Sequence, residues 1–303
     1  MTQKSQANTH TSTLFKRIIG NISGGDNQTL LVCIGGLHGN EQAGYDALEY
    51  LASHLDKRLF NGHFVAIGGN LQALKAKKRY LQTDLNRIWL NDLINNIPPD
   101  SEISEYEELR QLIEVLRVIP HDTYKRRILI DLHTTSAPNG AFVVRTTTTD
   151  DKIAQILEIP VILGLDKKLQ GTAMTYMEQW DYETFAFEGG TIGKENSTNN
   201  LVLGIWRIMQ ALQMTTQPIP NLEHTLGETI RSGVPNYLNC EYIHKIPQNS
   251  TFKMLEGFGN FDSIEEGQLL AHQDEKEIRS PYKGYILMPL YQDDGNDGFF
   301  IVK

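Results

Sequence analysis

The chain has 303 residues, of which 40% are hydrophobic and 21% are charged, and its formal net charge is −9. This composition is ordinary for a globular protein that buries a sizeable core, and the acidic balance argues against nucleic acid or an anionic membrane as a partner. Two cysteines, Cys33 and Cys240, are too few for a disulfide framework, so we expect a reducing, cytoplasmic location. No apolar run approaches the roughly 20 residues that a membrane helix needs.

Taken in chain order, the pattern predicts alternating strands and helices. Residues 1–13 are polar and lack the apolar segment of a signal peptide, so we expect a disordered leader there. Apolar runs bounded by turn residues predict strands over 13–20, 29–36, 62–70, 126–136, 140–146, 161–164 and 185–190. Helical spacing predicts helices over 42–59, 104–119, 151–160 and 199–214. This alternation predicts an α/β fold with a mixed, mostly parallel sheet and flanking helices.

The pattern of alternating strands and helices ends near Met214. A Pro- and Thr-rich connection follows, and short strand patterns separated by turns then continue to Lys303. We therefore expect a catalytic domain over residues 14–220 and a small all-β domain over residues 221–303.

Three of the predicted strands end in unusual polar residues. His38 and Glu41 follow the strand over 29–36, while His133 and Glu188 end two later strands. In an open α/β sheet, ligands bind beyond the carboxyl ends of the strands. Two imidazole nitrogens and one carboxylate oxygen are typical ligands of a catalytic zinc ion, which keeps a fourth position for water. A single His–Glu pair three residues apart, however, is commonly a surface contact.

The other polar candidates also have two interpretations. Asp131 would orient the imidazole of His133, or be an ordinary residue of the strand. Arg79 lies in "KAKKRY", which is typical of a solvated basic face. Arg87 could cap a helix or pair with Asp84, and Glu188 could be a turn residue at the end of its strand.

Four segments occur in an order and spacing that resembles a known family. They are "GGLHGNEQAG", "RYLQTDLNRIW", "LIDLHTT" and "FAFEGG", and together they cover about residues 27 to 210. The family is that of succinylglutamate desuccinylase and aspartoacylase, a branch of the zinc carboxypeptidase superfamily. The resemblance implies a zinc-carboxypeptidase-like fold. The C-terminal β domain matches the family only in its position and in its pattern of short strands and turns.

The resemblance also implies a role for each matching residue. One zinc ion per chain would be held by His38, Glu41 and His133. Glu188 would be the general base and Arg79 would polarise the scissile carbonyl. The carboxylate of the amino-acid half would be bound by Asn86 and Arg87. A C-terminal tyrosine contacts substrate in the family, and we choose Tyr291, with Tyr285 as the alternative.

The sequence departs from the family pattern before Glu188. Aspartoacylase-like members have an arginine about ten residues before this glutamate, which meets the second carboxylate of an acidic substrate. Residues 172–188 contain no arginine, and Glu178 stands at about that place. Since a carboxylate there would repel an acidic side chain, we expect Glu178 to favour neutral, aromatic or basic substrates.

These observations predict a zinc-dependent amidohydrolase that cleaves a small N-acyl amino acid, or a close analogue, to a carboxylate and an amine. A metallocarboxypeptidase acting on peptides and a zinc-binding ligand sensor without catalysis remain as alternatives. A serine hydrolase or a nucleotide enzyme is not indicated, because the sequence has neither a G-x-S-x-G elbow nor a P-loop. The oligomeric state stays open, with a homo-oligomer as one option.

Overall fold

The computed structural model describes residues 15–146, 149–222, 226 and 233–303, so the predicted leader over 1–13 lies outside the described residues. The helices are α1 Gln42–His54, α2 Leu71–Ala76, α3 Asn91–Asn95, α4 Ser104–Val118, α5 Asp151–Ile156, α6 Ala173–Glu178 and α7 Glu195–Ala211, with short 3₁₀ helices at η1 Lys57–Leu59, η2 Leu85–Arg87 and η3 His121–Thr123. The strands are β1 Ile18–Gly24, β2 Thr29–Gly35, β3 Gly62–Gly68, β4 Arg126–Thr135, β5 Phe142–Arg145, β6 Val161–Leu163, β7 Glu183–Thr191, β8 Tyr237–Lys245, β9 Phe252–Met254, β10 Asp262–Ile264, β11 Leu269–Gln273, β12 Lys276–Arg279, β13 Gly284–Leu287 and β14 Asp297–Val302.

A long mixed sheet runs through the described residues in the strand order β1-β3-β2-β4-β7-β5-β6-β8-β14-β13-β10. All neighbouring pairs among β1 to β8 are parallel except β1–β3 and β5–β7. Strands β12, β11 and β9 form a second, smaller sheet. The predicted α/β fold with a mostly parallel sheet is confirmed for the part that contains the predicted site.

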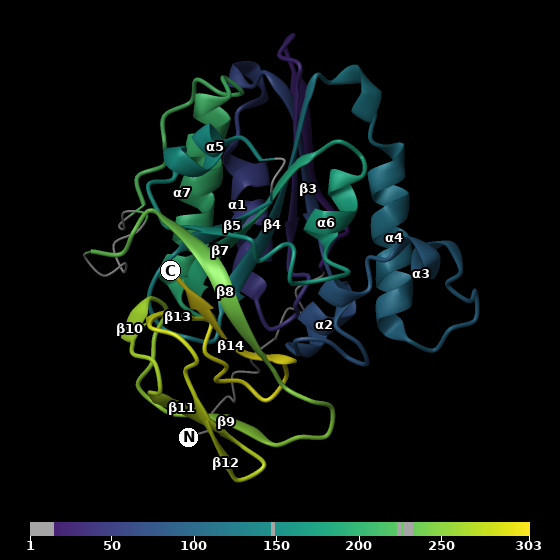
Figure 1. Cartoon of the computed structure of the whole chain (residues 1–303). Coiled ribbons are helices and arrows are strands. Elements are labelled where there is room, and N and C mark those ends of the chain that lie inside the picture. Colours follow the sequence, from purple (N-terminus) through teal and green to yellow (C-terminus); the bar gives the residue numbers. More distant parts are fainter. Residues whose placement is uncertain (1–14, 147–148, 223–225, 227–232) are drawn as a thin grey trace, which may run out of the picture.

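Helices cover both faces of this sheet (Figure 1). Strand β2 shows why, because its side chains alternate between two apolar cores. Leu31 and Cys33 join the cluster that contains residues of α1 and α7. Leu30, Val32 and Ile34 join the cluster that contains residues of α4 and α6. The uninterrupted apolar run of β2 is therefore required by burial on both faces.

The C-terminal part, residues 233–303 of the described chain, contains strands and no helix. Its strand β8 pairs in parallel with β6, so β8, β14, β13 and β10 extend the main sheet. Figure 1 shows β9, β11 and β12 below β13 and β14, at the bottom of the view. The all-β character agrees with the expectation from sequence, while the domain boundary between residues 220 and 221 stays a prediction.

The first strand differs from its prediction. The sequence predicts a strand over 13–20 and a turn after it, but β1 continues to Gly24, and Ile22 and Ser23 pair with Phe64 and His63. The Asn, Ser and Gly residues resemble a turn, yet an edge strand tolerates them because only one side of it is paired. Across the described residues, none of the helices is long and apolar enough to cross a membrane.

Candidate active site

The polar residues singled out in the sequence come together at the carboxyl ends of the parallel strands. His38 and Glu41 lie in the loop between β2 and α1, and His133 and Glu188 lie near the ends of β4 and β7. His133 and Glu188 are direct partners in the β4–β7 register, so both side chains are on the same face of the sheet. These residues thus lie at the edge of the sheet where the open-sheet argument places a ligand.

Two glycines shape the loop that carries His38 and Glu41. Gly36 has a φ of +81°, a conformation that residues with a side chain rarely adopt. A Cβ on Gly39 would lie 2.0 Å from the backbone carbon of Ala73, so the loop can pass α2 closely only with glycine there. The backbone N–H of Glu41 then donates to the carbonyl of His38 at 3.1 Å, which closes the turn.

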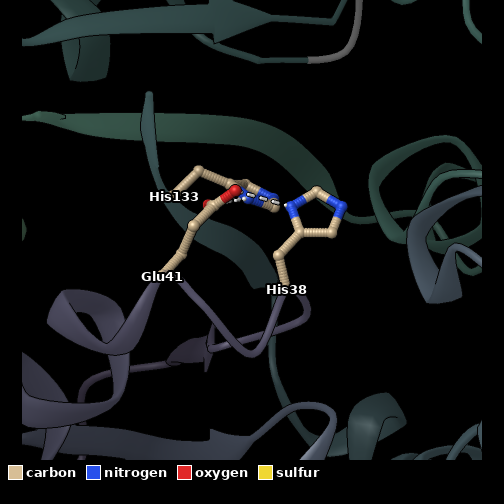
Figure 2. Close-up of side chains that lie close together, drawn as sticks. All are labelled: His38, Glu41 and His133. Atoms are coloured by element: carbon tan, nitrogen blue, oxygen red, sulfur yellow. Dashed lines mark hydrogen bonds and ion pairs between the residues drawn. The ribbon is translucent and has the colours of Figure 1, made fainter. Parts of the chain in front are cut away.

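His38, Glu41 and His133 form a compact cluster of metal-ligand type (Figure 2). All three are buried, and one ligand atom from each lies within 4.8 Å of the others. The Glu41 carboxylate is between the two rings, 2.9 Å from His38 Nδ1 and 3.0 Å from His133 Nδ1. The backbone N–H of Thr134 also donates to Glu41 Oε2 at 3.0 Å.

Each imidazole is held from its other nitrogen by an aspartate. His38 Nε2 lies 3.0 Å from Asp84 Oδ1, and His133 Nε2 lies 2.8 Å from Asp131 Oδ2. These contacts fix the rings so that both Nδ1 atoms face Glu41. A carboxylate behind each ligating histidine is common in metal sites, where it sets the tautomer and the ring orientation.

Electrostatic attraction stabilises the cluster. Burial opposes the charge of Glu41, but the charges and hydrogen bonds of His38 and His133 outweigh it and lower the pKa of Glu41 below its ordinary value. Burial likewise opposes the charge of His133, yet Asp131 and Glu41 raise the pKa of His133 well above its ordinary value. A metal ion at this site would therefore compete with a proton for the ring of His133.

Glu188 has a different environment from Glu41. It is buried, and within the described residues its Oε2 atom has no hydrogen-bond partner. Burial, reinforced by the charges of Glu41 and Asp131, outweighs the attraction of His133 and raises the pKa of Glu188 to about 8. A carboxyl group with a pKa near neutrality is suited to accept and return a proton at physiological pH.

Arg79 lies on the loop after α2 and reaches the cluster. Its Nη1 is 3.3 Å from Glu41 Oε1, and its Nη2 is 3.2 Å from Asp84 Oδ2. Burial lowers the pKa of Arg79, but Asp84 and Glu41 more than compensate, so the pKa is raised and the guanidinium stays charged. The interpretation of "KAKKRY" as a solvated face therefore does not hold for Arg79, whose side chain is 13% exposed.

Asn86 and Arg87 are both engaged by other protein groups. Asn86 Nδ2 donates to Asp131 Oδ2 at 3.0 Å, and Asn86 Oδ1 accepts from the backbone N–H of Ala173 at 2.9 Å. Arg87 Nη2 is 3.0 Å from Asp297 Oδ2, at the start of β14. Asn86 thus links Asp131, the carboxylate behind His133, to α6. Arg87 links its own segment to the first residue of β14.

A cavity of about 130 Å³ contains nearly all of these groups. Its polar lining includes His38, Glu41, Arg79, Asp84, Asn86, Arg87, Asp131, His133 and Glu188. Glu178 and Tyr291 are not among the described residues that line it. The hydroxyl of Tyr291 instead donates to the carbonyl of Leu255 at 2.8 Å. The lining of the cavity therefore gives no support to a substrate contact by Glu178 or Tyr291, and both contacts stay predictions.

The sequence does not single out, as site residues, two carboxylates that pair with the arginines of this cavity. Asp84 was considered only as a partner of Arg87, whereas it contacts His38 and Arg79. Its place between Arg79 and Asn86 in the "RYLQTDLNRIW" segment was the available signal. Asp297 gave no signal, because its contact with Arg87 joins positions 210 residues apart.

Comparison with solved structures defines the class of fold. The crystal structure of a succinylglutamate desuccinylase/aspartoacylase from Rhodobacter sphaeroides superposes with a TM-score of 0.66, covering 93% of this chain and 88% of that chain at 16% identity. The chain therefore has the zinc-carboxypeptidase-like α/β fold of that group of proteins, as predicted.

Sequence comparison then identifies the family. Residues 26–212 match the succinylglutamate desuccinylase/aspartoacylase catalytic domain, so the chain belongs to this family. A probable aspartoacylase of Nostoc is 32% identical over 116 residues, which is 37% of this chain and 37% of that protein's length. A succinylglutamate desuccinylase of Pseudomonas fluorescens is 25% identical over 268 residues, which is 83% of this chain and 75% of that protein.

Proposed function

We propose that the protein is a zinc-dependent deacylase that hydrolyses the amide bond of a small N-acyl amino acid, or a close analogue, to a carboxylate and an amine. One observation carries the proposal. The His38–Glu41–His133 cluster lies in the same cavity as Glu188, whose buried Oε2 has no partner within the described residues. Family membership supports it, because desuccinylases and aspartoacylases are named for removing an acyl group from an amino acid.

The donor set fits zinc. Two imidazole nitrogens and one carboxylate are three ligands of the type that catalytic zinc uses, and both rings are already oriented by Asp84 and Asp131. When bound, zinc supplies Lewis acidity that polarises a carbonyl group and makes coordinated water more acidic. His38, Glu41 and His133 are the residues that would hold it.

Glu188 is the proposed proton carrier. As a carboxylate it accepts a proton from the attacking water, and as a carboxylic acid it returns this proton to the amine that leaves. Its pKa of about 8 suits both steps, since neither protonation state is strongly disfavoured near neutral pH. Glu188 is the register partner of His133, which places it beside the proposed metal ligands.

The two arginines have separate proposed roles. Arg79 lies against Glu41 and is charged, so it can stabilise the negative oxygen that develops on the scissile carbonyl. Arg87 can bind the carboxylate of the amino-acid half in place of Asp297. Asn86 donates to Asp131, lies 3.2 Å from His133 Nε2 and lines the cavity, so it can hold the His133 ring and take part in binding the same carboxylate.

Metal binding should be visible as a gain in stability. Zn²⁺ at about 100 times its dissociation constant is expected to stabilise the folded protein by about 2.7 kcal/mol. Calorimetry should show a higher unfolding temperature with Zn²⁺, reversed by a chelator, and no such rise in His133→Ala. The matched control is His54→Ala, since His54 is an exposed histidine outside the cavity. An undiminished rise in His133→Ala would place the metal elsewhere.

The activity itself is tested by amine release from a panel of N-acyl amino acids. The panel combines acetyl, succinyl and longer acyl groups with acidic, neutral, aromatic and basic amino acids, and each member is tested with Zn²⁺ and with chelator. We expect release that depends on Zn²⁺ from at least one class of substrate. Cleavage of peptides alone would indicate a carboxypeptidase, and tight binding without turnover would indicate a sensor.

A further inference from the structure

The cavity wall next to Glu188 is apolar. Ala186 lies two residues before Glu188 on the same face of β7, and its register partner on β5 is Val144. Phe300 of β14 and Met174 of α6 also line the cavity and are buried. These four side chains belong to one hydrophobic cluster, so the wall is a continuous surface that combines three strands and a helix.

Two leucines of the loop between β6 and α6 complete this wall. Leu165 and Leu169 follow β6, and both line the cavity and pack against the same cluster. Leu165 is 2% exposed, whereas Leu169 is only half-buried and is therefore more accessible from the cavity. We call the surface formed by Val144, Leu165, Leu169, Met174, Ala186 and Phe300 the apolar wall.

The charges around the apolar wall exclude a second anion. Among the described residues that line the cavity, the cations apart from histidine are Arg79 and Arg87. Arg79 is bound to Glu41 and Asp84, and Arg87 is bound to Asp297. The remaining charged group near Leu165 in the lining is Asp166, which is acidic. A carboxylate placed against the apolar wall would therefore lose its hydration without gaining a counter-charge.

We propose that the substrate carries an apolar group, on its acyl half or its amino-acid side chain, that packs against the apolar wall. This inference rests on the proposed deacylase function and names its substrate class. The apolar wall also provides a physical cause for discrimination against acidic substrates that differs from the one expected from sequence. Desolvation by the apolar wall opposes the second carboxylate, rather than repulsion by Glu178, which does not line the cavity.

Two substrate series test the inference. One lengthens the acyl group on a fixed amino acid from acetyl to hexanoyl, and the other varies the side chain of an N-acetyl amino acid from alanine to norvaline, leucine and phenylalanine. We expect kcat/KM to rise roughly fourfold per added methylene in one of the two series, which identifies the half that meets the wall. N-acetylaspartate, N-acetylglutamate and succinylated amino acids should be at least a hundredfold poorer. A preference for these acidic members, or no dependence on chain length, would overturn the inference.

A charge placed in the wall provides the second test. Leu169→Lys supplies the missing cation, and because Leu169 is half-buried the variant is expected to fold. The ratio of kcat/KM for the best apolar substrate to that for an acidic one should fall at least tenfold. The control Leu212→Lys makes the same change at a half-buried leucine outside the cavity and should keep the wild-type ratio. An unchanged ratio in Leu169→Lys would contradict the inference.

The failure of the inference is distinct from the failure of the proposed function. If no panel member is hydrolysed, deacylation itself is wrong, and binding then decides the fate of the apolar wall. Calorimetric titration of wild type and Leu169→Lys with hexanoate and with succinate uses no turnover. Tighter binding of hexanoate to wild type, reversed in Leu169→Lys, supports the wall as an apolar site, and tighter binding of succinate to wild type refutes it.

Discussion

Glu188→Gln is expected to lower kcat by about a hundredfold to ten-thousandfold while leaving zinc affinity nearly unchanged. Glutamine preserves the size of the side chain but can neither accept a proton from water nor return one to the amine. Glu188 is outside the His38–Glu41–His133 cluster, so the proposed ligands stay in place. Turnover of the best panel substrate and Zn²⁺ titration by calorimetry measure the two quantities separately.

The matched control lies on the same strand. Glu183→Gln makes the same chemical change five residues earlier on β7, where Glu183 pairs with Arg126 at 2.8 Å and does not line the cavity. This variant should keep wild-type kcat. Normal turnover in Glu188→Gln would remove Glu188 from the mechanism, and loss of Zn²⁺ binding in that variant would make it a ligand rather than a base.

Glu188→Gln should also stabilise the metal-free protein. The folded-state pKa of Glu188 is about 8, against an ordinary value of 4.5, so the folded protein binds a proton more tightly than the unfolded chain. Wild-type stability should therefore fall as pH rises from about 4.5 towards 8, and Glu188→Gln should not show this loss. Urea unfolding at pH 7 is expected to find the variant more stable by on the order of 1–3 kcal/mol, and equal or lower stability would contradict the buried environment of this carboxyl group.

Glu105→Ala is expected to destabilise the protein by roughly 3–5 kcal/mol and to disturb the loop that carries Arg79. Glu105 is fully buried on α4. Its carboxylate accepts from three consecutive backbone N–H groups, those of Leu81, Gln82 and Thr83, at 2.6, 3.2 and 3.3 Å. Alanine removes the acceptor of these part-buried donors and of the fully buried Asn70 Nδ2, which lies 3.3 Å from Glu105 Oε1. A buried donor left without an acceptor costs about 1–3 kcal/mol.

Urea unfolding and amide hydrogen exchange test this prediction. Exchange at residues 81–83 should accelerate in Glu105→Ala, and zinc affinity should fall because Asp84, on the same loop, loses its fixed position behind His38. Glu114→Ala removes an exposed carboxylate from the same helix and should change stability by less than about 0.5 kcal/mol. Equal effects of the two substitutions would show that the Glu105 contacts contribute little.

The parts of the site on strands were predictable because burial dictates their periodicity. The apolar runs of β2, β4 and β7 end close to His38, His133 and Glu188, and parallel strands bring their carboxyl ends to one edge. The three proposed ligands and Glu188 could be found in this way. Arg79 is indicated by the family resemblance alone. The loop that carries Arg79 and Asp84 follows a path that depends on Glu105, a contact that no local pattern reveals.

Other features of the structure could not be predicted from the sequence, for physical reasons. The count of about ten residues back from Glu188 ends in the short helix α6, where a count of residues does not translate into distance along a strand, so the role of Glu178 stays a prediction. Helix α6 was missed because its six residues include threonine and tyrosine, which have low helix propensity, while Thr172 caps its start. Tyr291 was chosen by position alone, and its hydroxyl is used within the C-terminal strands.

The ion pair between Arg87 and Asp297 has a consequence for how the protein is made. The N-terminus of a chain leaves the ribosome first. The residues of the His38–Glu41–His133 cluster therefore emerge long before β14, which pairs with β8 and β13. Until Asp297 and Phe300 are added, one wall of the cavity is missing and Arg87 has no carboxylate partner from β14. A nascent chain can thus bring its three proposed metal ligands together early, yet complete the wall of the cavity only in the last stage of folding, when the most distant contacts form.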